Sequence, residues 1–346
     1  MIKVKVISLL GSVIVILLLL LNATQEVTDV HLTGPTMGTS YNVKIRKDEG
    51  LVVSADELKD KIDQRLAKIN KLMSTYDPHS ELSRFNQHHS TLPFTLSAET
   101  MLVLREAKRL GELSDGVLDV TVGPLVNLWG FGPDAKPEVI PSKATIEALK
   151  QKIGLDKLYL GSNTASKLTP DLYVDLSTIA KGYGVDEIAN LLESLGHTNY
   201  LVEIGGEMRV AGLKGNGIAW RIAVEQPVID KRDVQTVLSI GNNAIATSGD
   251  YRNYFEENGV RYSHLIDPRT GYPIQHNLVS VTVVHPSSMT ADGLATALGV
   301  MGKDAALRLA QEQQLDVMLI TREKDGFKTY TSGRFDEYIQ AAKQQN

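Results

Sequence analysis

Cysteine is absent from this sequence. The chain therefore has no disulfides, no Cys-ligated zinc or iron–sulfur site, no cysteine nucleophile and no lipidated N-terminal cysteine. Aromatic residues make up only 6% of the chain, and 36 basic side chains face 41 acidic ones, a formal net charge of −5. Because binding to nucleic acid requires a clustered basic surface, this charge balance gives no reason to expect it.

Several motifs that mark large enzyme classes are also missing. The sequence has no G-x-S-x-G elbow, no Walker A loop, no H-E-x-x-H pair and no dinucleotide-binding G-x-G-x-x-G. What it does have is ordinary globular composition, with 42% hydrophobic and 22% charged residues in 346. That composition excludes disordered and low-complexity classes, and the length suffices for a large core.

The N-terminus carries the one long hydrophobic run. Lys3 and Lys5 precede residues 6–21, which contain no charge, and this order is typical of an export signal or an uncleaved membrane anchor. A buried N-terminal helix is the alternative, but the flanking lysines and the lack of a polar face disfavour it. We expect residues 1–23 to be a signal or anchor and residues 24–346 to form an exported domain. Without Lys3 and Lys5 that domain has 34 basic and 41 acidic side chains, a balance of −7.

Hydrophobic periodicity predicts helices and strands in both halves of the chain. Helices are expected from Ser54, where Ser54-Ala55-Asp56-Glu57 forms a capping pattern, and over residues 97–113, 143–153, 179–195, 289–301 and 305–312. Residues 30–45 predict two strands around a turn, residues 158–160 and 172–176 predict a pair of strands, and residues 123–141 predict loop. Further strands are expected at residues 200–204, 208–212, 220–224, 237–240, 244–247, 279–284, 316–320 and 327–331.

The order of these elements indicates the fold class. Helices do not follow every strand, so a doubly wound parallel sheet is excluded and an α+β (mixed α/β) architecture is expected.

A candidate metal site lies on one predicted helix. Asp292 and Thr296 stand at i and i+4, so their oxygens face the same way. A carboxylate and a hydroxyl, completed by carbonyls and water, form a partial shell that suits Mg²⁺. In the alternative interpretation, Asp292 favours the helix N-terminus while Thr296 bonds back to the i−4 carbonyl.

Three shorter signals have equally plain structural explanations. The helix that begins at residues 179–182 could hold a phosphate on its free N–H groups, or Ser177 or Thr178 could simply cap it. Gly205-Gly206 permits the close approach of a flat ligand or forms only a tight turn. His264 lies in a polar stretch, where a lone histidine is more often structural than catalytic.

Taken together, the polar segments resemble the FAD:protein FMN transferase family, the ApbE flavin transferases, from about Thr33 to Thr331. The motifs that carry the resemblance are Thr36-Met37-Gly38-Thr39, Ser74-Thr75-Tyr76, residues 119–133, Val174-Asp175-Leu176-Ser177, Thr247-Ser248-Gly249 with residues 251–254, and residues 263–271. The resemblance implies an ApbE-like fold of mixed sheets and flanking helices, with the flavin site between the two halves. It also implies Mg²⁺-dependent transfer of the FMN half of FAD to a Thr or Ser hydroxyl of a target protein, with release of AMP.

The resemblance also implies roles for particular residues. Those expected to line the FAD site are Met37, Tyr76, Val117, Leu118, Asp119, Lys181 and Ile266, and those expected to hold Mg²⁺ are Ala180 through its carbonyl, Asp292 and Thr296. Family targets are flavin-carrying subunits of sodium-pumping NADH:quinone oxidoreductase and of the Rnf complex. Such targets match an enzyme on the periplasmic side of the bacterial inner membrane, here anchored by its N-terminal helix.

The chemistry suggests two catalytic residues, His264 and Asp292. His264 is the candidate to deprotonate or orient the acceptor hydroxyl, with Asp267 as a candidate to orient it in turn. Two features depart from relatives: no lipobox cysteine follows the hydrophobic run, and Ala295 stands where some relatives have an aspartate. Two rival functions remain open from the sequence, hydrolysis of FAD to FMN and AMP and non-catalytic flavin binding.

Overall fold

The computed structural model describes residues 29–46, 53–132, 140–228, 233–249, 254–257 and 260–344. The expected anchor at residues 1–23 and the motif residues 251–253 lie outside these ranges. Within the described ranges, no helix is long and apolar enough to cross a membrane.

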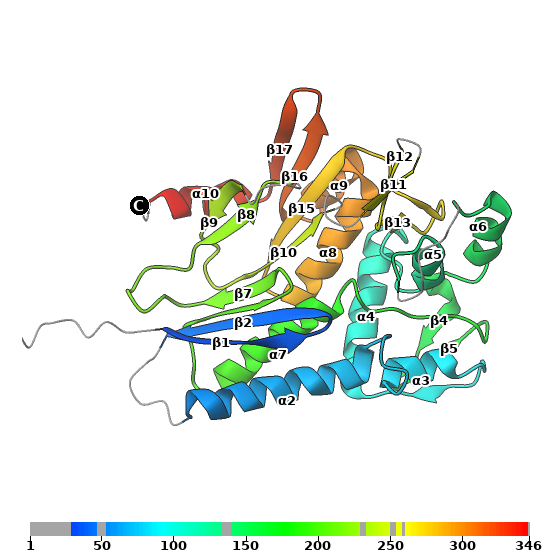
Figure 1. The fold of residues 1–346 in the computed structure, drawn as a ribbon, viewed down its shortest axis with the longest axis horizontal. Coiled ribbons are helices and arrows are strands. Elements are labelled where there is room, and N and C mark those ends of the chain that lie inside the picture. The colour runs from blue at the N-terminus through cyan, green and yellow to red at the C-terminus, as the bar shows by residue number, and fades with distance from the viewer. Residues whose placement is uncertain are drawn as a thin grey trace, which may run out of the picture.

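An eight-stranded antiparallel sheet forms the centre of the fold (Figure 1). Each strand pairs with its neighbours in antiparallel register. In spatial order the strands are β1 (Asp29–Thr36), β2 (Thr39–Arg46), β6 (Tyr200–Ile204), β7 (Glu207–Ala211), β10 (Ala244–Gly249), β15 (Leu278–His285), β16 (Asp316–Glu323) and β17 (Gly326–Ser332).

Helices cover one face of this sheet. Helix α7 (Ala180–Ser194) packs on β6 and β7, and α8 (Ser288–Met301) packs on β10 and β15. Helix α2 (Ala55–Met73) packs against β1 and α7, and α4 (Ala98–Leu113) packs against α8 (Figure 1). The helices are α2 (Ala55–Met73), α3 (Glu81–Gln87), α4 (Ala98–Leu113), α5 (Gly123–Leu128), α6 (Lys143–Lys150), α7 (Ala180–Ser194), α8 (Ser288–Met301), α9 (Lys303–Glu312) and α10 (Phe335–Lys343), with a 3₁₀ turn η1 (Leu155–Lys157).

The other face of the sheet carries a smaller layer. Strands β8 (Ile222–Glu225) and β9 (Val234–Leu238) form a hairpin that packs with α10 on apolar side chains of β10, β15 and β16. Alternate residues of β10 and of β16 therefore face the two layers, as the pleat of a sheet requires. The remaining small sheets are β3 (Phe94–Thr95) and β4 (Leu158–Leu160) on either side of β5 (Thr164–Lys167), β11 (Tyr254–Glu257) with β12 (Val260–Ser263), and β13 (Ile266–Asp267) with β14 (Tyr272–Pro273).

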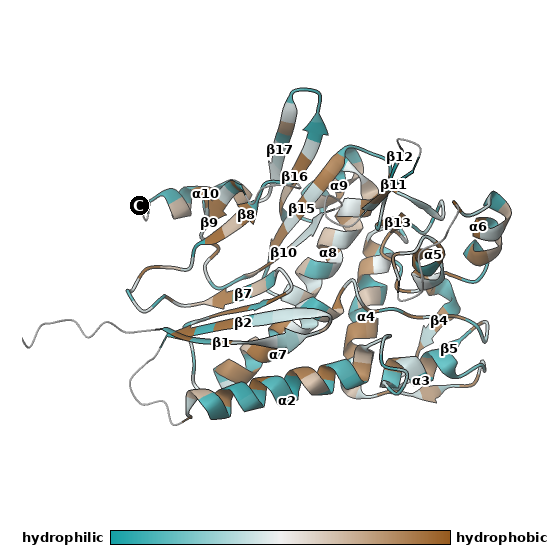
Figure 2. Cartoon of the chain, viewed as in Figure 1, coloured by the Kyte–Doolittle hydropathy of each residue, from teal (hydrophilic) through white to brown (hydrophobic). Residues whose placement is uncertain are grey.

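The long helices form where the sequence predicts them. Ser54 caps α2 by accepting from the Glu57 N–H at 3.2 Å, and Ser97 caps α4 by accepting from Thr100 N–H at 3.2 Å. Helix α2 combines hydrophilic and hydrophobic residues along its length (Figure 2), and its buried side chains recur every three or four positions. The buried set is Leu58, Ile62, Leu66, Ile69 and Met73.

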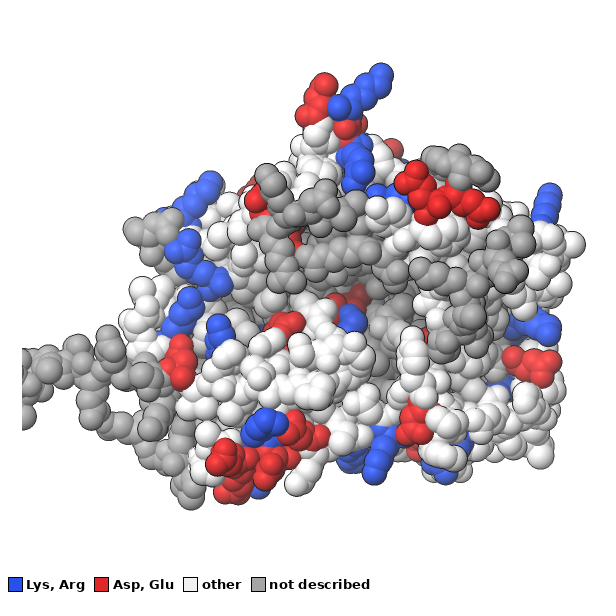
Figure 3. Space-filling model, in the orientation of Figure 1, with Lys and Arg blue, Asp and Glu red and all other residues white. Residues whose placement is uncertain are grey.

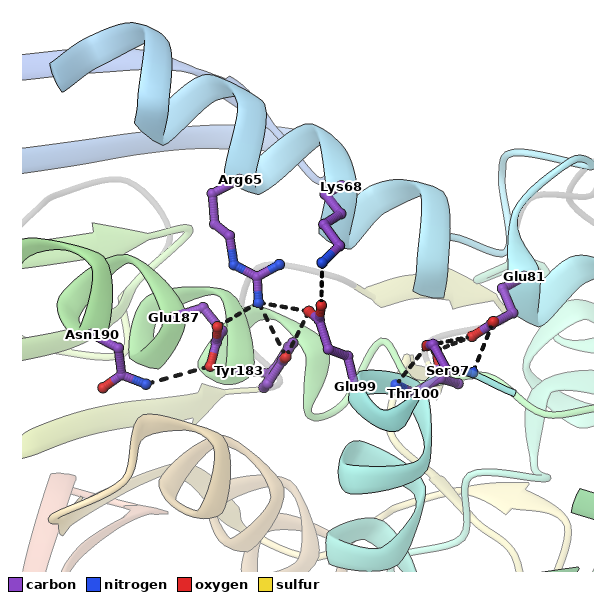
Figure 4. Close-up of polar contacts among 9 residues, drawn as sticks. All are labelled: Arg65, Lys68, Glu81, Ser97, Glu99, Thr100, Tyr183, Glu187 and Asn190. Atoms are coloured by element: carbon purple, nitrogen blue, oxygen red, sulfur yellow. Dashed lines mark hydrogen bonds and ion pairs between the residues drawn. The ribbon is translucent and has the colours of Figure 1, made fainter. Parts of the chain in front are cut away.

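A polar cluster ties three helices together beneath the sheet (Figure 4). Glu99 of α4 accepts hydrogen bonds from Arg65 and Lys68 of α2, each at 2.6 Å, and from the Tyr183 hydroxyl of α7 at 3.0 Å. Arg65 also pairs with Glu187 of α7. Burial alone would raise the pKa of Glu99, but these donors outweigh it and lower that pKa to about 2.

Two predictions are wrong. Residues 123–128 form α5 instead of loop, because Pro124 occupies a first-turn position where its missing N–H has no helical partner to lose. Residues 172–176 are not a strand, and β4 pairs with β5 instead. The Asn86 side chain takes the place of a partner strand there, bonding both the N–H and the carbonyl of Val174 at 2.8 Å. The sequence patterns also missed α3, α10, β3, β5, β11, β12 and the two-residue strands β13 and β14.

Candidate active site

A cavity of about 370 Å³ opens between the helical layer and the sheet. Its walls come from both halves of the chain: the segment after α4, the start of α7, the turn between β6 and β7, the end of β10, and α8. Figure 3 shows this face of the molecule hollowed near its middle, with acidic and basic side chains visible in the hollow. The predicted residues that line the cavity are Tyr76, Val117, Leu118, Asp119, Lys181, His264, Ile266, Asp292 and Thr296.

A second cavity of about 520 Å³ adjoins the first. The two share Tyr76, Ser177 and Lys181 in their walls, so they form one cleft with two chambers. Met37 and Ala180, the two remaining predicted residues, line the second chamber. The structure thus brings every predicted site residue to this cleft.

Three charged side chains meet in the first chamber. The Lys181 Nζ lies 2.6 Å from Glu207 Oε2 and 3.8 Å from Asp292 Oδ1. Both carboxyl groups are buried, and burial is the main cause that raises the pKa of each. Burial alone would lower the pKa of Lys181, but the charges of Asp292 and Glu207 outweigh it and raise that pKa. When both acids are ionised, this group carries one net negative charge, which a bound cation could balance.

Glu207 was not predicted as a site residue. It begins β7 directly after Gly205-Gly206, where φ is +58° and +107°, and this turn directs the chain back toward the cavity. Alternation along β7 then places Glu207 on the helical face and Met208 on the opposite face, in contact with the apolar layer. The sequence did contain a signal for Glu207, because the strand pattern places this acidic residue on the inward face.

Asp292 does not cap its own helix. Ser287 is the N-cap of α8, accepting from Thr290 N–H at 3.2 Å, so Asp292 lies in the second turn. Its Oδ2 instead accepts the N–H of Gly182 at 3.0 Å, in the first turn of α7. The interpretation in which Asp292 serves its own helix N-terminus is therefore wrong.

Ser177, Thr178 and Thr296 do not serve the ends or turns of their own helices either. The residue before α7 makes no side-chain cap, and the Ser177 hydroxyl bonds to Asp175 at 2.5 Å, so neither Ser177 nor Thr178 caps this helix. Among the described residues, the Thr296 hydroxyl makes no hydrogen bond to the i−4 carbonyl or to any other group, and Thr296 lines the cavity. Thr296 is therefore oriented to serve a ligand rather than its own helix.

The oxygen donors suit a hard cation. Asp292 and Thr296 offer a carboxylate and a hydroxyl one helical turn apart, and Ala180 opens the adjoining helix, whose Gly182 N–H holds Asp292. No group of three His, Asp or Glu side chains in the described part of the chain could hold a metal by itself. The other ligands of a cation here would be carbonyl oxygens, water or a bound substrate. Ala295 packs in the apolar core and does not line the cavity.

His264 follows β12 and lines the same chamber. A series of stacked rings fixes the hairpin in front of it: Phe131 on Phe255 at 5.6 Å, Phe255 on Tyr262 at 5.0 Å, and Tyr262 on Trp129 at 5.5 Å. The Phe131 ring also meets the His264 ring edge-on at 6.3 Å. These contacts hold His264 at the wall of the cavity.

Asp267 does not orient His264. Its carboxylate instead accepts from the Arg269 side chain at 2.8 and 3.0 Å and from the Arg269 N–H at 2.9 Å. Although burial alone would raise the pKa of Asp267, the bonds from Arg269 lower it. The carboxylate thus stabilises the turn before β14.

The sequence matches the ApbE family over residues 37–319. It is 53% identical over 323 residues to the FAD:protein FMN transferase of Vibrio cholerae, covering 93% of this chain and 96% of that protein. It is 43% identical over 326 residues to the FAD:protein FMN transferase of Escherichia coli K12, covering 93% and 92%.

Solved structures agree with the sequence matches. The flavin transferase ApbE from Vibrio cholerae superposes with a TM-score of 0.85 at 52% identity, covering 90% of this chain and 99% of that one. The apo form of the flavinyl transferase ApbE from Pseudomonas stutzeri gives a TM-score of 0.84 at 38% identity, covering 90% and 97%.

Proposed function

Because the chain belongs to the ApbE family, we propose that it is an FAD:protein FMN transferase. The reaction joins the oxygen of a protein Thr or Ser hydroxyl to the FMN phosphorus of FAD. The bond between that phosphorus and the oxygen bridging to the AMP phosphate breaks, AMP leaves, and the hydroxyl proton is released. The observation that carries the proposal is the contact of Lys181, which both chambers share, with the buried Glu207 and Asp292 of the first chamber, in a chain matched over 93% of its length by an FAD:protein FMN transferase.

The cleft can hold a dinucleotide along both chambers. Lys181 is shared by the two chambers, so a pyrophosphate there would meet a positive charge while each nucleotide half occupied one chamber. Tyr76 is 70% exposed at the junction, where its ring is available to stack on a flavin or adenine. Met37 adds a polarisable surface in the second chamber.

Mg²⁺ is the cation proposed for the oxygen donors. Asp292, Thr296 and the Ala180 carbonyl would hold it, and when bound it would polarise phosphate oxygens as a Lewis acid. Lys181 balances the buried carboxylates and keeps Asp292 close to the first turn of α7. Glu207 holds Lys181 in place through the 2.6 Å contact.

His264 is the proposed general base. It lines the chamber that contains Lys181 and Asp292, and it would take the proton from the acceptor hydroxyl as that oxygen attacks. The contact of its ring with Phe131, which stacks on Phe255, restricts the movement of His264 and favours a fixed position for the proton transfer.

The proposed location of the enzyme and its proposed acceptor depend on the N-terminal sequence. Lys3, Lys5 and the uncharged run at residues 6–21 support an enzyme tethered at the periplasmic face of the bacterial inner membrane. Flavin-carrying subunits of sodium-pumping NADH:quinone oxidoreductase or of Rnf-type complexes are the proposed acceptors, since they would meet the enzyme on that side.

Intact-protein mass spectrometry tests the function. The soluble domain of a flavin-carrying subunit of a sodium-pumping NADH:quinone oxidoreductase is incubated with this protein, FAD and Mg²⁺. We expect the acceptor to gain the mass of one FMN residue, and fragmentation to place it on a Thr or Ser. A matched incubation with FMN in place of FAD should leave the acceptor unmodified. Conversion of FAD to FMN and AMP beside an unchanged acceptor would establish a hydrolase instead.

A further inference from the structure

We call the first chamber, which contains Lys181 and Asp292, the reaction chamber. A third cavity, of about 290 Å³, adjoins it from the opposite side of the sheet. Its walls are the β6–β7 turn, β8 and the end of β10. It shares Gly205, Thr247 and Gly249 as wall residues with the chamber that holds Lys181 and Asp292, so the two cavities are neighbours at this edge of the sheet. We call this cavity the β8–β10 groove.

The edge of β10 faces this groove, and beyond Ile245 it pairs with no strand among the described residues. Strand β10 pairs with β7 only at Ala244 and Ile245, yet it continues to Gly249, paired on its other side with β15. Strand β8, paired with β9, forms the opposite wall of the groove. A strand edge with free N–H and carbonyl groups is a ready template for an extended chain.

The geometry of β10 indicates where the side chains of an added strand would point. Ser248 faces α8, with its Oγ near Gly299, and lines only the reaction chamber, whereas Ile245 lines the groove and packs in the apolar layer. Because the pleat alternates, a chain paired with β10 would direct one side chain into the reaction chamber and its neighbours into the groove. Gly205 and Gly206 add no side chains at the passage between the two.

We propose that the β8–β10 groove binds an extended segment of the acceptor protein, which adds as a strand to the free edge of β10. This inference rests on the proposed transferase function, which requires a polypeptide hydroxyl to reach the reaction chamber. The two chambers on the helical side are assigned to the halves of FAD, and the groove lies on the other side of the sheet, where it borders the reaction chamber and shares no wall residue with the second chamber. Main-chain hydrogen bonds would supply affinity, and the hydroxyl side chain would enter beside Asp292 and His264.

The first test fills the groove. Ala223 of β8 lines it, is exposed, and does not line either FAD chamber. Ala223→Trp should reduce kcat/KM for the acceptor at least tenfold, while FAD affinity and thermal melting stay at wild-type values. Val234→Trp is the matched control, since Val234 is 56% exposed on the paired strand β9 and does not line the groove. Equal transfer by wild type and Ala223→Trp would overturn the proposal.

The second test probes main-chain pairing. Synthetic peptides of the acceptor, centred on the residue that mass spectrometry identifies as flavinylated, are N-methylated at one backbone position at a time. Alternate N–H groups of a strand point to the same side, so strand addition predicts loss of transfer at every second position and retention between them. A uniform response at all positions would overturn strand addition.

Failure of the transferase function and failure of the groove give different results. If wild-type protein does not modify the unmethylated acceptor at all, the transferase function fails. If it does, and neither the Trp variant nor the methylation pattern has the expected effect, only the groove fails.

Discussion

Gly182 sets the distance between the two helices that form the reaction centre. An ideal Cβ at this position would lie 2.3 Å from the Ser288 carbonyl oxygen and 2.8 Å from Met289 Cα, both backbone atoms of α8. Ordinary contact begins at 3.4 Å, so Gly182→Ala must push the helices apart by about 1 Å. Because backbone atoms cannot rotate away as a side chain can, the clash can be relieved only by moving the helices apart.

The separation acts directly on the site. The Gly182 N–H donates to Asp292 Oδ2 at 3.0 Å, and lengthening that bond by about 1 Å breaks it and shifts Asp292 relative to Lys181. A misplacement of this size typically costs about 10²-fold in rate. Overpacking should also destabilise the fold by about 1–3 kcal/mol, which the better helix propensity of alanine offsets by up to about 1 kcal/mol.

The assay compares two glycines of the same helix. Transfer rates and thermal melting are measured for Gly182→Ala and for Gly184→Ala. The Cβ of the second variant would meet only the ends of flexible side chains, Met37 Cε at 3.0 Å and Ile204 Cδ1 at 3.2 Å. We expect Gly182→Ala to melt below Gly184→Ala and to lose transfer. Wild-type transfer by Gly182→Ala would refute the view that this close approach of α7 and α8 positions Asp292.

Three further predictions concern individual side chains. Asp292→Asn keeps the size of the side chain and an acceptor for the Gly182 N–H but removes the charge. Titrations should then show that Mg²⁺ and FAD no longer strengthen each other's binding, and transfer should be abolished with little change in the melting temperature. Activity of this variant at low Mg²⁺ would contradict the assignment. His264→Ala should slow transfer by about 10²–10⁴-fold with FAD affinity nearly unchanged, and full activity in steady-state assays would make this histidine structural. The folded-state pKa of Glu99 is about 2 against 4.5, so its stabilising contribution is complete above pH 4.5 and is lost as the pH falls toward 2. Urea unfolding at pH 5 and pH 3 should therefore show that wild type loses about 1–2 kcal/mol more than Glu99→Gln, and equal losses would show that the bonds to Arg65 and Lys68 contribute nothing.

Local sequence signals predicted the fold correctly where nearby residues make the hydrogen bonds of the backbone. Ser54 and Ser97 cap the helices they precede, and the 30–45 segment forms the expected hairpin. The prediction failed where a side chain distant in the sequence makes these bonds. The Asn86 side chain bonds the backbone of Val174, 88 residues away, and so replaces a strand partner. No periodicity at residues 172–176 could reveal that.

The site follows the same division. Spacing marked Asp292 and Thr296 as a pair but left a capping role open, because the Gly182 N–H that occupies Asp292 lies 110 residues earlier. Glu207 follows Gly205-Gly206 in the sequence, but only the pairing of β6 with β7 in the sheet brings its carboxylate to Lys181. The motifs shared with the ApbE family predicted site residues that residue spacing alone could not identify.

The ratio of AMP released to acceptor modified tests the central claim most directly. Both products are quantified in one reaction of wild-type protein, FAD, Mg²⁺ and the acceptor domain. Attack by the acceptor hydroxyl predicts one AMP for each flavinylated acceptor throughout the time course. AMP that accumulates while the acceptor stays unmodified would contradict it, because water would then be the nucleophile in the Lys181–Glu207–Asp292 chamber.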